Sequence, residues 1–320
     1  MSQSIKSITF EGKLKVWGVY NYNTIEKKDG HNNHKGAKKF KFKTGEKKTN
    51  KDGQEYEIKK EIDYTSSRCI RHEMFKDIQP RQPSDKEFGA QFIKMVTSEI
   101  GLLRGYMSPD EKGNNQDIKG LKRCSPLHIA DAQTINKVDI VFDQGSSSKP
   151  KEGSKKSKEG KDISDTSMFS QDNSPCREQK LLGGISLKEL QFLSLYGVDN
   201  DFSMISKNHK DDFLKYLREY FQKHNVDNNL EIKEYEDKGA VYKIKRAGIL
   251  LNQDQIRHLV TVVFQRIKMI NGLKAGARLS YKKGSLKASF FDGEDYLDLE
   301  ESDLKEKLNT MNFHHFFQNV

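Results

Sequence analysis

The chain has little of what disulfide-rich, zinc-binding or membrane-spanning proteins depend on. Its three cysteines, Cys69, Cys124 and Cys176, are odd in number and far apart, which argues against a disulfide framework or a zinc site and suggests a reducing compartment. No apolar run approaches the ~18 residues that a membrane span needs. The first ten residues also lack the apolar stretch of a signal peptide. We therefore expect a cytoplasmic protein without a membrane partner.

Signatures of catalysis and metal binding are also missing. The sequence contains no phosphate-binding loop motif, no HExxH, no Gly-x-Ser-x-Gly and no CxxC pair. His314 and His315 are adjacent and do not share one helix face, so a metal site there needs distant ligands. His72 is the remaining candidate for a general base, set against a phosphate contact or an ordinary surface histidine. We predict a protein that is not an enzyme and holds no cofactor or metal.

What the sequence does have is positive charge, and this charge is unevenly spread. The net charge of the 320 residues is +10. Residues 27–60 hold twelve lysines against five acidic residues, whereas residues 292–303 hold seven acidic residues and no basic one. A basic body suggests a polyanionic partner. The acidic patch permits head-to-tail contact between copies, although solubility alone is the simpler explanation of it.

The most informative segment is a helix predicted at 67–78. At 100° per residue its basic and apolar side chains fall on opposite sides: Arg68, Arg71, His72 and Lys76 against Ile70, Met74 and Ile78. The hydroxyl residues Thr65, Ser66 and Ser67 come where a helix cap is expected. Because a helix N-terminus presents free N–H groups and a partial positive charge, this segment is suited to hold phosphate.

Further basic residues recur on other predicted elements. They are Arg104 before Gly105, Lys122 and Arg123 in a loop, and Lys243, Lys245 and Arg246 on a predicted strand. Tyr20, Tyr22 and Tyr106 are candidates for stacking on bases, although core tyrosines are commoner. The aromatic consensus of an ordinary RNA-recognition motif is absent. The combination predicts a protein that holds phosphate and ribose without reading base sequence.

The order of predicted elements indicates a single α+β domain over residues 1–320. Period-two alternation predicts a central strand at 8–22, and the lysine-rich stretch 25–60 predicts a projecting basic hairpin with its turn at 45–53. The other predicted elements are helices at 85–103, 209–224 and 253–271, strands at 184–195 and 240–246, a cap at 248–252, a hairpin at 277–291, a loop at 105–125 and a disordered low-complexity insertion at 144–180. A ferredoxin-like antiparallel sheet with helices on one face fits this order.

Several segments resemble, in one order along the chain, the backbone subunit of CRISPR Cascade complexes, the Cas-seven family. The resemblance is closest to the compact variant branch of type I-F. The segments are 67–75, 100–106, 122–127, 184–195 and 248–252.

The resemblance implies a palm similar to an RNA-recognition motif, a helical finger region and a projecting hairpin thumb, for which 39–60 is the candidate. It implies that copies of the chain assemble along the spacer of one guide crRNA together with other Cascade subunits. They would clamp the phosphate backbone and leave the bases free to pair with target DNA.

The resemblance also implies roles for particular residues. Ser67, Arg68, Arg71 and His72 are expected to hold guide phosphates, with Arg104, Tyr106, Lys122 and Arg123 as further contacts. It implies no nuclease activity. Two alternatives stay open at this point: a metal-independent ribonuclease that processes the guide with His72 as base, and an unrelated basic scaffold protein that ignores RNA.

Overall fold

The chain folds as an α+β protein built on antiparallel sheets, as the sequence predicts. The computed structural model describes residues 4–18, 22–28, 31–37, 39–50, 53–78, 88–107, 122–135, 142–147, 167–172, 176–196, 209–239, 245–274 and 277–320. These residues form a ten-stranded sheet, a four-stranded sheet and three two-stranded pairs. No helix in these ranges is long and apolar enough to cross a membrane.

Strand β1 lies at the centre of the large sheet. One edge of it pairs with β12 and the other with two strands placed end to end: β1 is Ser7–Trp17, β12 Arg177–Ile185, β17 Ala277–Tyr281 and β18 Lys287–Phe291. Alternate side chains of β1 are buried, as the period-two pattern predicts: Ile8, Phe10, Leu14 and Val16. The strand stops before the predicted residue 22 because Gly18 turns the chain with a φ of 64°.

The sheet continues outward from both flanks of this centre. On one side β12 pairs with β8 (Leu127–Ile129) and β9 (Ala132–Thr134), and β9 leads to β5 (Glu55–Thr65) and β4 (Lys39–Thr49). On the other side β17 pairs with β16 (Asn271–Lys274), and β18 pairs with β19 (Tyr296–Glu300).

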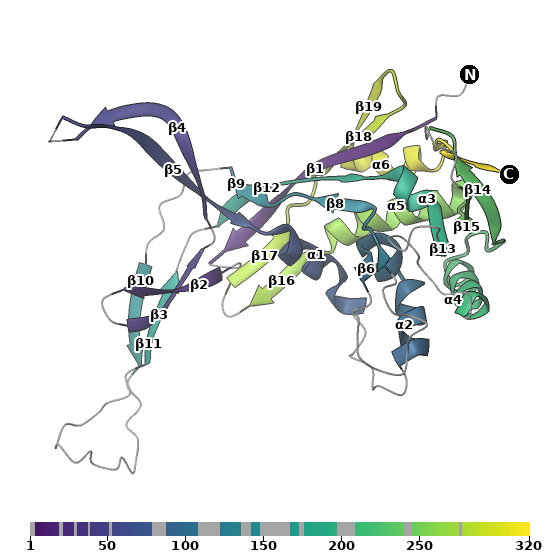
Figure 1. Cartoon of the computed structure of the whole chain (residues 1–320). Coiled ribbons are helices and arrows are strands. Elements are labelled where there is room, and N and C mark those ends of the chain that lie inside the picture. Colours follow the sequence, from purple (N-terminus) through teal and green to yellow (C-terminus); the bar gives the residue numbers. More distant parts are fainter. Residues whose placement is uncertain are drawn as a thin grey trace, which may run out of the picture.

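Strands β4 and β5 form an antiparallel hairpin that projects from the body (Figure 1). The hairpin is the one predicted from the lysine-rich stretch, but its turn lies at 50–54 rather than at 45–53. Residues before it form a separate pair, β2 (Tyr22–Lys28) with β3 (His31–Ala37). Arg177 fixes the base of the hairpin by donating to Asp63 at 2.5 Å and to the carbonyl of Gly18 at 2.6 Å.

The helices cover the buried face of the large sheet. Helix α5 (Gln253–Lys268) begins with a capping box between Asn252 and Gln255, and its Phe264 ring meets Phe10 of β1 edge-on at 6.1 Å. Together with α4 (Lys210–Lys223) it confirms the helices predicted at 253–271 and 209–224. The other helices are α1 (Ser67–Phe75) with the short η1 (Lys76–Ile78), α2 (Phe88–Val96) and α6 (Glu301–Leu308).

The strand predicted at 184–195 is wrong, because a helical turn interrupts it. Strand β12 ends at Ile185, and the Ser186 hydroxyl then accepts a hydrogen bond from the Glu189 N–H as the cap of α3 (Leu187–Gln191). Strand β13 (Phe192–Tyr196) follows and starts the four-stranded sheet with β15 (Lys245–Leu250), β14 (Lys233–Asp237) and β20 (Phe317–Asn319). Leu187 and Leu190 are buried, and their spacing of three fits a helix better than a strand.

Two further predictions are corrected by contacts distant in sequence. Residues 277–291 are not a hairpin, since β17 and β18 both pair with the same edge of β1 and only an irregular segment around Gly284 separates them. The helix predicted at 85–103 breaks after Val96 into α2 and the π-helix η2 (Ile100–Arg104). Thr97 and Ser98 there donate side-chain hydrogen bonds to the carbonyls of Ile93 and Met95, which competes with the helical ladder.

The predicted loop and the predicted disordered insertion both have paired ends. Strand β6 (Tyr106–Met107) pairs with β7 (Lys122–Arg123), and β10 (Phe142–Ser147) pairs with β11 (Ser167–Asp172). Residues 108–121 and 148–166 lie outside the described residues. So do residues 240–244 of the strand predicted at 240–246; residues 245–250 belong to β15, and of the predicted cap at 248–252 only Asn252 caps a helix.

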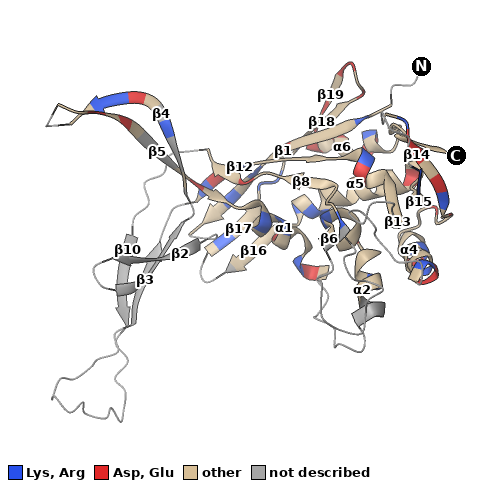
Figure 2. Cartoon of the chain, viewed as in Figure 1, with Lys and Arg blue, Asp and Glu red and all other residues tan. Residues whose placement is uncertain are grey.

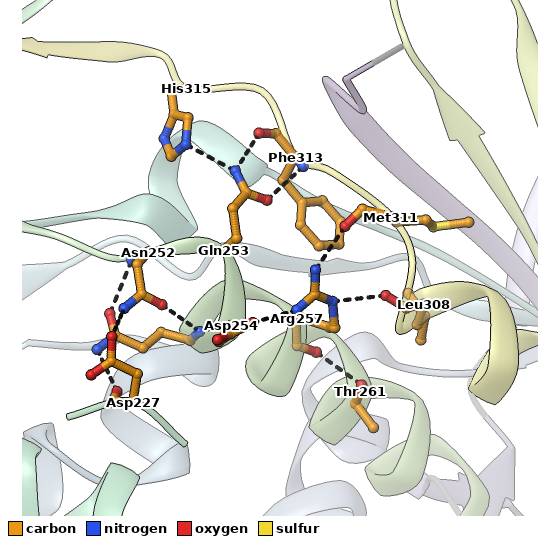
Figure 3. A network of polar contacts seen from close by, with 11 residues as sticks. Asp227, Asn252, Gln253, Asp254, Arg257, Thr261, Leu308, Met311, Phe313 and His315 are labelled. Atoms are coloured by element: carbon orange, nitrogen blue, oxygen red, sulfur yellow. Dashed lines mark hydrogen bonds and ion pairs between the residues drawn. The ribbon is translucent and has the colours of Figure 1, made fainter. Parts of the chain in front are cut away.

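The C-terminal segment is held by the first turns of α5 (Figure 3). The Gln253 side chain donates to the carbonyl of Phe313 at 2.7 Å and accepts from its N–H at 2.8 Å. The Arg257 guanidinium donates to the carbonyls of Leu308 and Met311. These bonds satisfy backbone groups of an irregular segment and lead it to β20, where it completes the four-stranded sheet.

A buried ion cluster joins α5 to two other elements. Arg266 is buried, and its guanidinium donates to Glu99 at 2.6 Å and to both carboxylate oxygens of Asp77 at 2.7 Å. Glu99 precedes η2 and Asp77 lies in η1. The cluster therefore fixes the ends of α1 and of the α2–η2 region relative to the core helix.

We expect Arg266→Ala to lower the free energy of unfolding by about 3 kcal/mol, because removing one partner leaves carboxylates unpaired in a partly buried site. Urea denaturation measures this. The control is Lys287→Ala, which removes the exposed ion pair with Glu300 and is expected to leave stability within error of the wild type. Equal losses in the two variants would contradict the structural role of Arg266.

Candidate nucleic-acid interface

Helix α1 has the two-sided character that the sequence predicts. Arg68 and His72 are exposed, whereas Ile70 and Met74 on the opposite side are buried in the core. Arg71 lies at the boundary and is partly buried. Burial of one apolar stripe therefore fixes which side chains α1 presents to solvent.

The cap of α1 differs from the prediction. Ser66 is the N-cap residue but its hydroxyl makes no capping bond, and the N–H of Ser67 instead donates to the Asp131 carboxylate at 2.6 Å. Asp131 comes from the turn between β8 and β9. Because a carboxylate already occupies this N–H, an anion near α1 depends on the arginine side chains rather than on the Ser67 backbone.

Three arginines from two elements lie close together, and we call Arg68, Arg71 and Arg104 the arginine cluster. Burial lowers the pKa of Arg104, and the positive charges of Arg71 and Arg68 lower it further. The Nε atom of Arg71 is buried and has no hydrogen-bond partner. Within the described residues no carboxylate forms an ion pair with any of the three. The arrangement concentrates positive charge that the protein itself does not neutralise.

A glycine allows Arg104 to reach this position. Gly105 follows η2 with a φ of 75°, a left-handed conformation that other residues rarely adopt. A Cβ atom there would come within 2.5 Å of the Arg123 carbonyl oxygen and within 2.8 Å of the Ser125 nitrogen. Close packing of η2 against β7 therefore depends on this residue having no side chain.

Arg123 points inward and is not available for RNA in this structure. It is buried, and its guanidinium donates to the carbonyls of Leu102, Phe192 and Glu189 at 3.0–3.3 Å. Burial lowers its pKa to about 10, although Tyr106 and Glu189 oppose this shift. We therefore withdraw Arg123 from the expected phosphate contacts and assign it a structural role.

Tyr106 also belongs to the interior. Its ring meets Phe92 edge-on at 5.4 Å, and burial raises the pKa of its hydroxyl. This position does not suit stacking on a nucleobase. The sequence alone did not distinguish these inward residues from Arg68, because a basic or aromatic residue next to a loop is compatible with either orientation.

The remaining predicted site residues lie apart from the arginine cluster. Lys122 pairs through its backbone with Met107, and its side chain, like all of Lys243, lies outside the described residues. Lys245 is exposed on β15, and its neighbour Arg246 is partly buried. Successive residues of a strand point to opposite faces, so these two basic side chains serve different surfaces.

Sequence reasoning missed a pocket beside Arg246. It has a volume of about 400 Å³ and lies between α3 and the four-stranded sheet, with Arg123, Ser194, Phe192 and Phe317 among its lining residues. No sequence motif marks it, because its residues come from five separate segments. The predicted histidines His314 and His315 lie nearby in the C-terminal segment, and burial lowers the pKa of both. Within the described residues no group of three or more candidate metal ligands occurs.

Comparison with known proteins gives a family for the whole fold. The family model described as type I-Fv CRISPR-associated protein Cas7fv-like matches residues 4–318. No curated protein matches the chain. The match covers the arginine cluster, both large sheets and the projecting hairpin, and it confirms the resemblance found in the sequence. The chain belongs to the Cas7fv-like family of type I-Fv CRISPR-associated proteins.

Proposed function

We propose that this chain is a non-catalytic backbone subunit of a type I-F variant Cascade complex, which holds the phosphate backbone of a guide crRNA and leaves its bases free to pair with target DNA. Family membership supports the Cascade role. The observation that carries RNA binding is the arginine cluster, with Arg68 and Arg71 on α1 and Arg104 at the end of η2.

Holding three guanidinium groups together without a carboxylate is unfavourable unless an anion neutralises them. Arginine matches phosphate in shape and donates two hydrogen bonds at once, so a phosphodiester is a suitable partner. Such contacts fix the position of a strand but carry no sequence information. Binding of this kind suits a protein that must accept any guide sequence.

The shape of the chain supports assembly of several copies along one RNA. The sheet centred on β1 serves as the palm, and the β4–β5 hairpin extends far enough from it to act as the thumb (Figure 1). Figure 2 shows basic residues along β4 and α1 and acidic residues at the turn between β18 and β19. We propose that the hairpin of one copy contacts the next copy, with other Cascade subunits at the ends of the row.

We expect the double substitution Arg68→Ala and Arg71→Ala to weaken binding to a guide-length RNA by roughly tenfold or more, because two charge-assisted contacts are lost. The slope of log affinity against log salt should fall by about 2, since each lost cation releases about one counterion fewer. Fluorescence anisotropy at several salt concentrations measures both quantities.

The control is the double substitution Lys305→Ala and Lys307→Ala on α6, which removes the same charge from exposed positions away from α1. It should change affinity only slightly. If the arginine variant bound RNA with the affinity and salt dependence of the wild type, the proposed interface would be wrong.

Incubating the pure protein with precursor guide RNA separates the backbone role from the ribonuclease alternative. We expect the RNA to remain intact, because His72 is an exposed residue on the same side of α1 as Arg68 and suits a phosphate contact. Cleavage that disappears in His72→Ala would instead establish a ribonuclease.

Co-expression with guides of different spacer length tests assembly. A backbone subunit should form particles whose mass rises in steps as the spacer lengthens, measured by native mass spectrometry. Particles of constant mass would contradict the proposed row of copies.

A further inference from the structure

The pocket between α3 and the four-stranded sheet contains a hydroxyl with no partner. Ser194 lines this pocket, is 6% exposed, and its Oγ atom is buried without a hydrogen bond. A buried polar atom left unsatisfied costs free energy, so native structures rarely keep one without a reason. A ligand that offers a hydrogen-bonding edge at this point would satisfy it.

The wall of the pocket is aromatic. The rings of Phe192 and Phe317 are stacked with centroids 4.7 Å apart and planes 29° apart, and Tyr235 meets Phe192 edge-on at 5.8 Å. Gly248 lets the Phe192 ring lie directly on the neighbouring strand, since a Cβ atom there would come within 2.6 Å of that ring. Aromatic walls of this kind suit a flat, apolar ring.

The polar side of the pocket is cationic. Arg246 lines it and has no hydrogen-bond or ion-pair partner among the described residues, whereas Lys188 pairs with Asp237 and Glu189 pairs with His128. The neighbouring charges are therefore internally compensated and Arg246 is not. A flat ring that carries a nearby negative group fits this combination, which is the chemistry of a nucleotide.

The pocket is connected to the arginine cluster through Arg123. The carbonyl of Arg123 packs against Gly105, the residue after Arg104, and its guanidinium lines the pocket. A strand held by the arginine cluster therefore passes close to the entrance. This continuity favours a base of that strand over a side chain of another protein.

We propose that this pocket binds the base of one nucleotide of the RNA strand that the arginine cluster holds, with Phe192 and Phe317 beside the base, Ser194 on its polar edge and Arg246 on its phosphate. The proposal rests on the proposed function. It adds one base-dependent contact per copy to binding that otherwise involves the backbone alone. Stacking and a single hydroxyl accept all bases, so the contact remains compatible with any guide sequence.

Cys124 provides a direct probe, because it lines the same pocket and is exposed. The experiment measures the rate of alkylation of Cys124 by mass spectrometry in the wild-type chain, alone, with saturating RNA and with an abasic ribose-phosphate strand of equal length. Cys176 is exposed outside the pocket and serves as the internal control. We expect RNA to slow alkylation of Cys124 by roughly tenfold, as one stacked base implies, and the abasic strand to have little effect.

Variants test the same contact from the protein side. Arg246→Ala should abolish most of the protection of Cys124 by RNA, whereas Lys245→Ala, its neighbour on the opposite face of β15, should not. Ser194→Leu fills the pocket and should also abolish protection; thermal melting first establishes that it is folded. If it does not fold, the Arg246→Ala result decides.

The outcomes separate this proposal from the proposed function. No binding of either strand would overturn the proposed function. Normal binding with equal protection by RNA and abasic strand, or with no protection by either, would overturn only the base pocket. Protection that appears when copies associate without RNA would identify a protein segment as the occupant and would also overturn it.

Discussion

One buried guanidinium joins the two parts of the molecule on which the proposed interface depends. Arg123 donates to carbonyl oxygens of η2, α3 and β13, three elements that are far apart in sequence. Each of these carbonyls lies at the end or the start of its element, where the regular hydrogen-bond pattern stops. A single rigid group with five donors therefore satisfies backbone atoms that would otherwise be buried without partners. It also fixes the end of η2, and with it Arg104, relative to the second sheet.

The arginine cluster is an unfavourable arrangement that the rest of the fold holds in place. Arg68, Arg71 and Arg104 repel each other, and burial adds to the cost at Arg104. The opposing contributions are ordinary ones: the apolar side of α1 packs into the core, Asp131 caps its first turn, and Arg266 fixes the ends of both elements through Asp77 and Glu99. Concentrated charge without a partner inside the protein is typical of a site whose partner is another molecule.

The two basic surfaces serve different parts of a nucleotide strand in this interpretation. The arginine cluster is exposed and has no aromatic residue in its immediate description, so it suits phosphates. The pocket next to it is enclosed, aromatic and lined by one uncompensated cation, so it suits a base with its phosphate. A row of copies would then hold the guide mainly through its backbone and anchor it once per copy. Such anchoring would keep the register between copies constant along the RNA.

The sequence by itself determined the features that depend on local periodicity and charge. The central strand, the helices α4 and α5, the hairpin β4–β5 and the two-sided character of α1 all follow from patterns within some 20 residues. Only the tertiary structure decided which basic residues face outward, since Arg71 and Arg123 look alike in sequence but one joins the arginine cluster and the other binds carbonyls in the interior. It alone decided that 277–291 runs along one edge of β1 rather than folding back, and that Phe192, Ser194, Arg246 and Phe317 share a pocket. The physical reason is that hydrogen bonds between distant strands and burial by distant segments set these outcomes, and no local pattern records them.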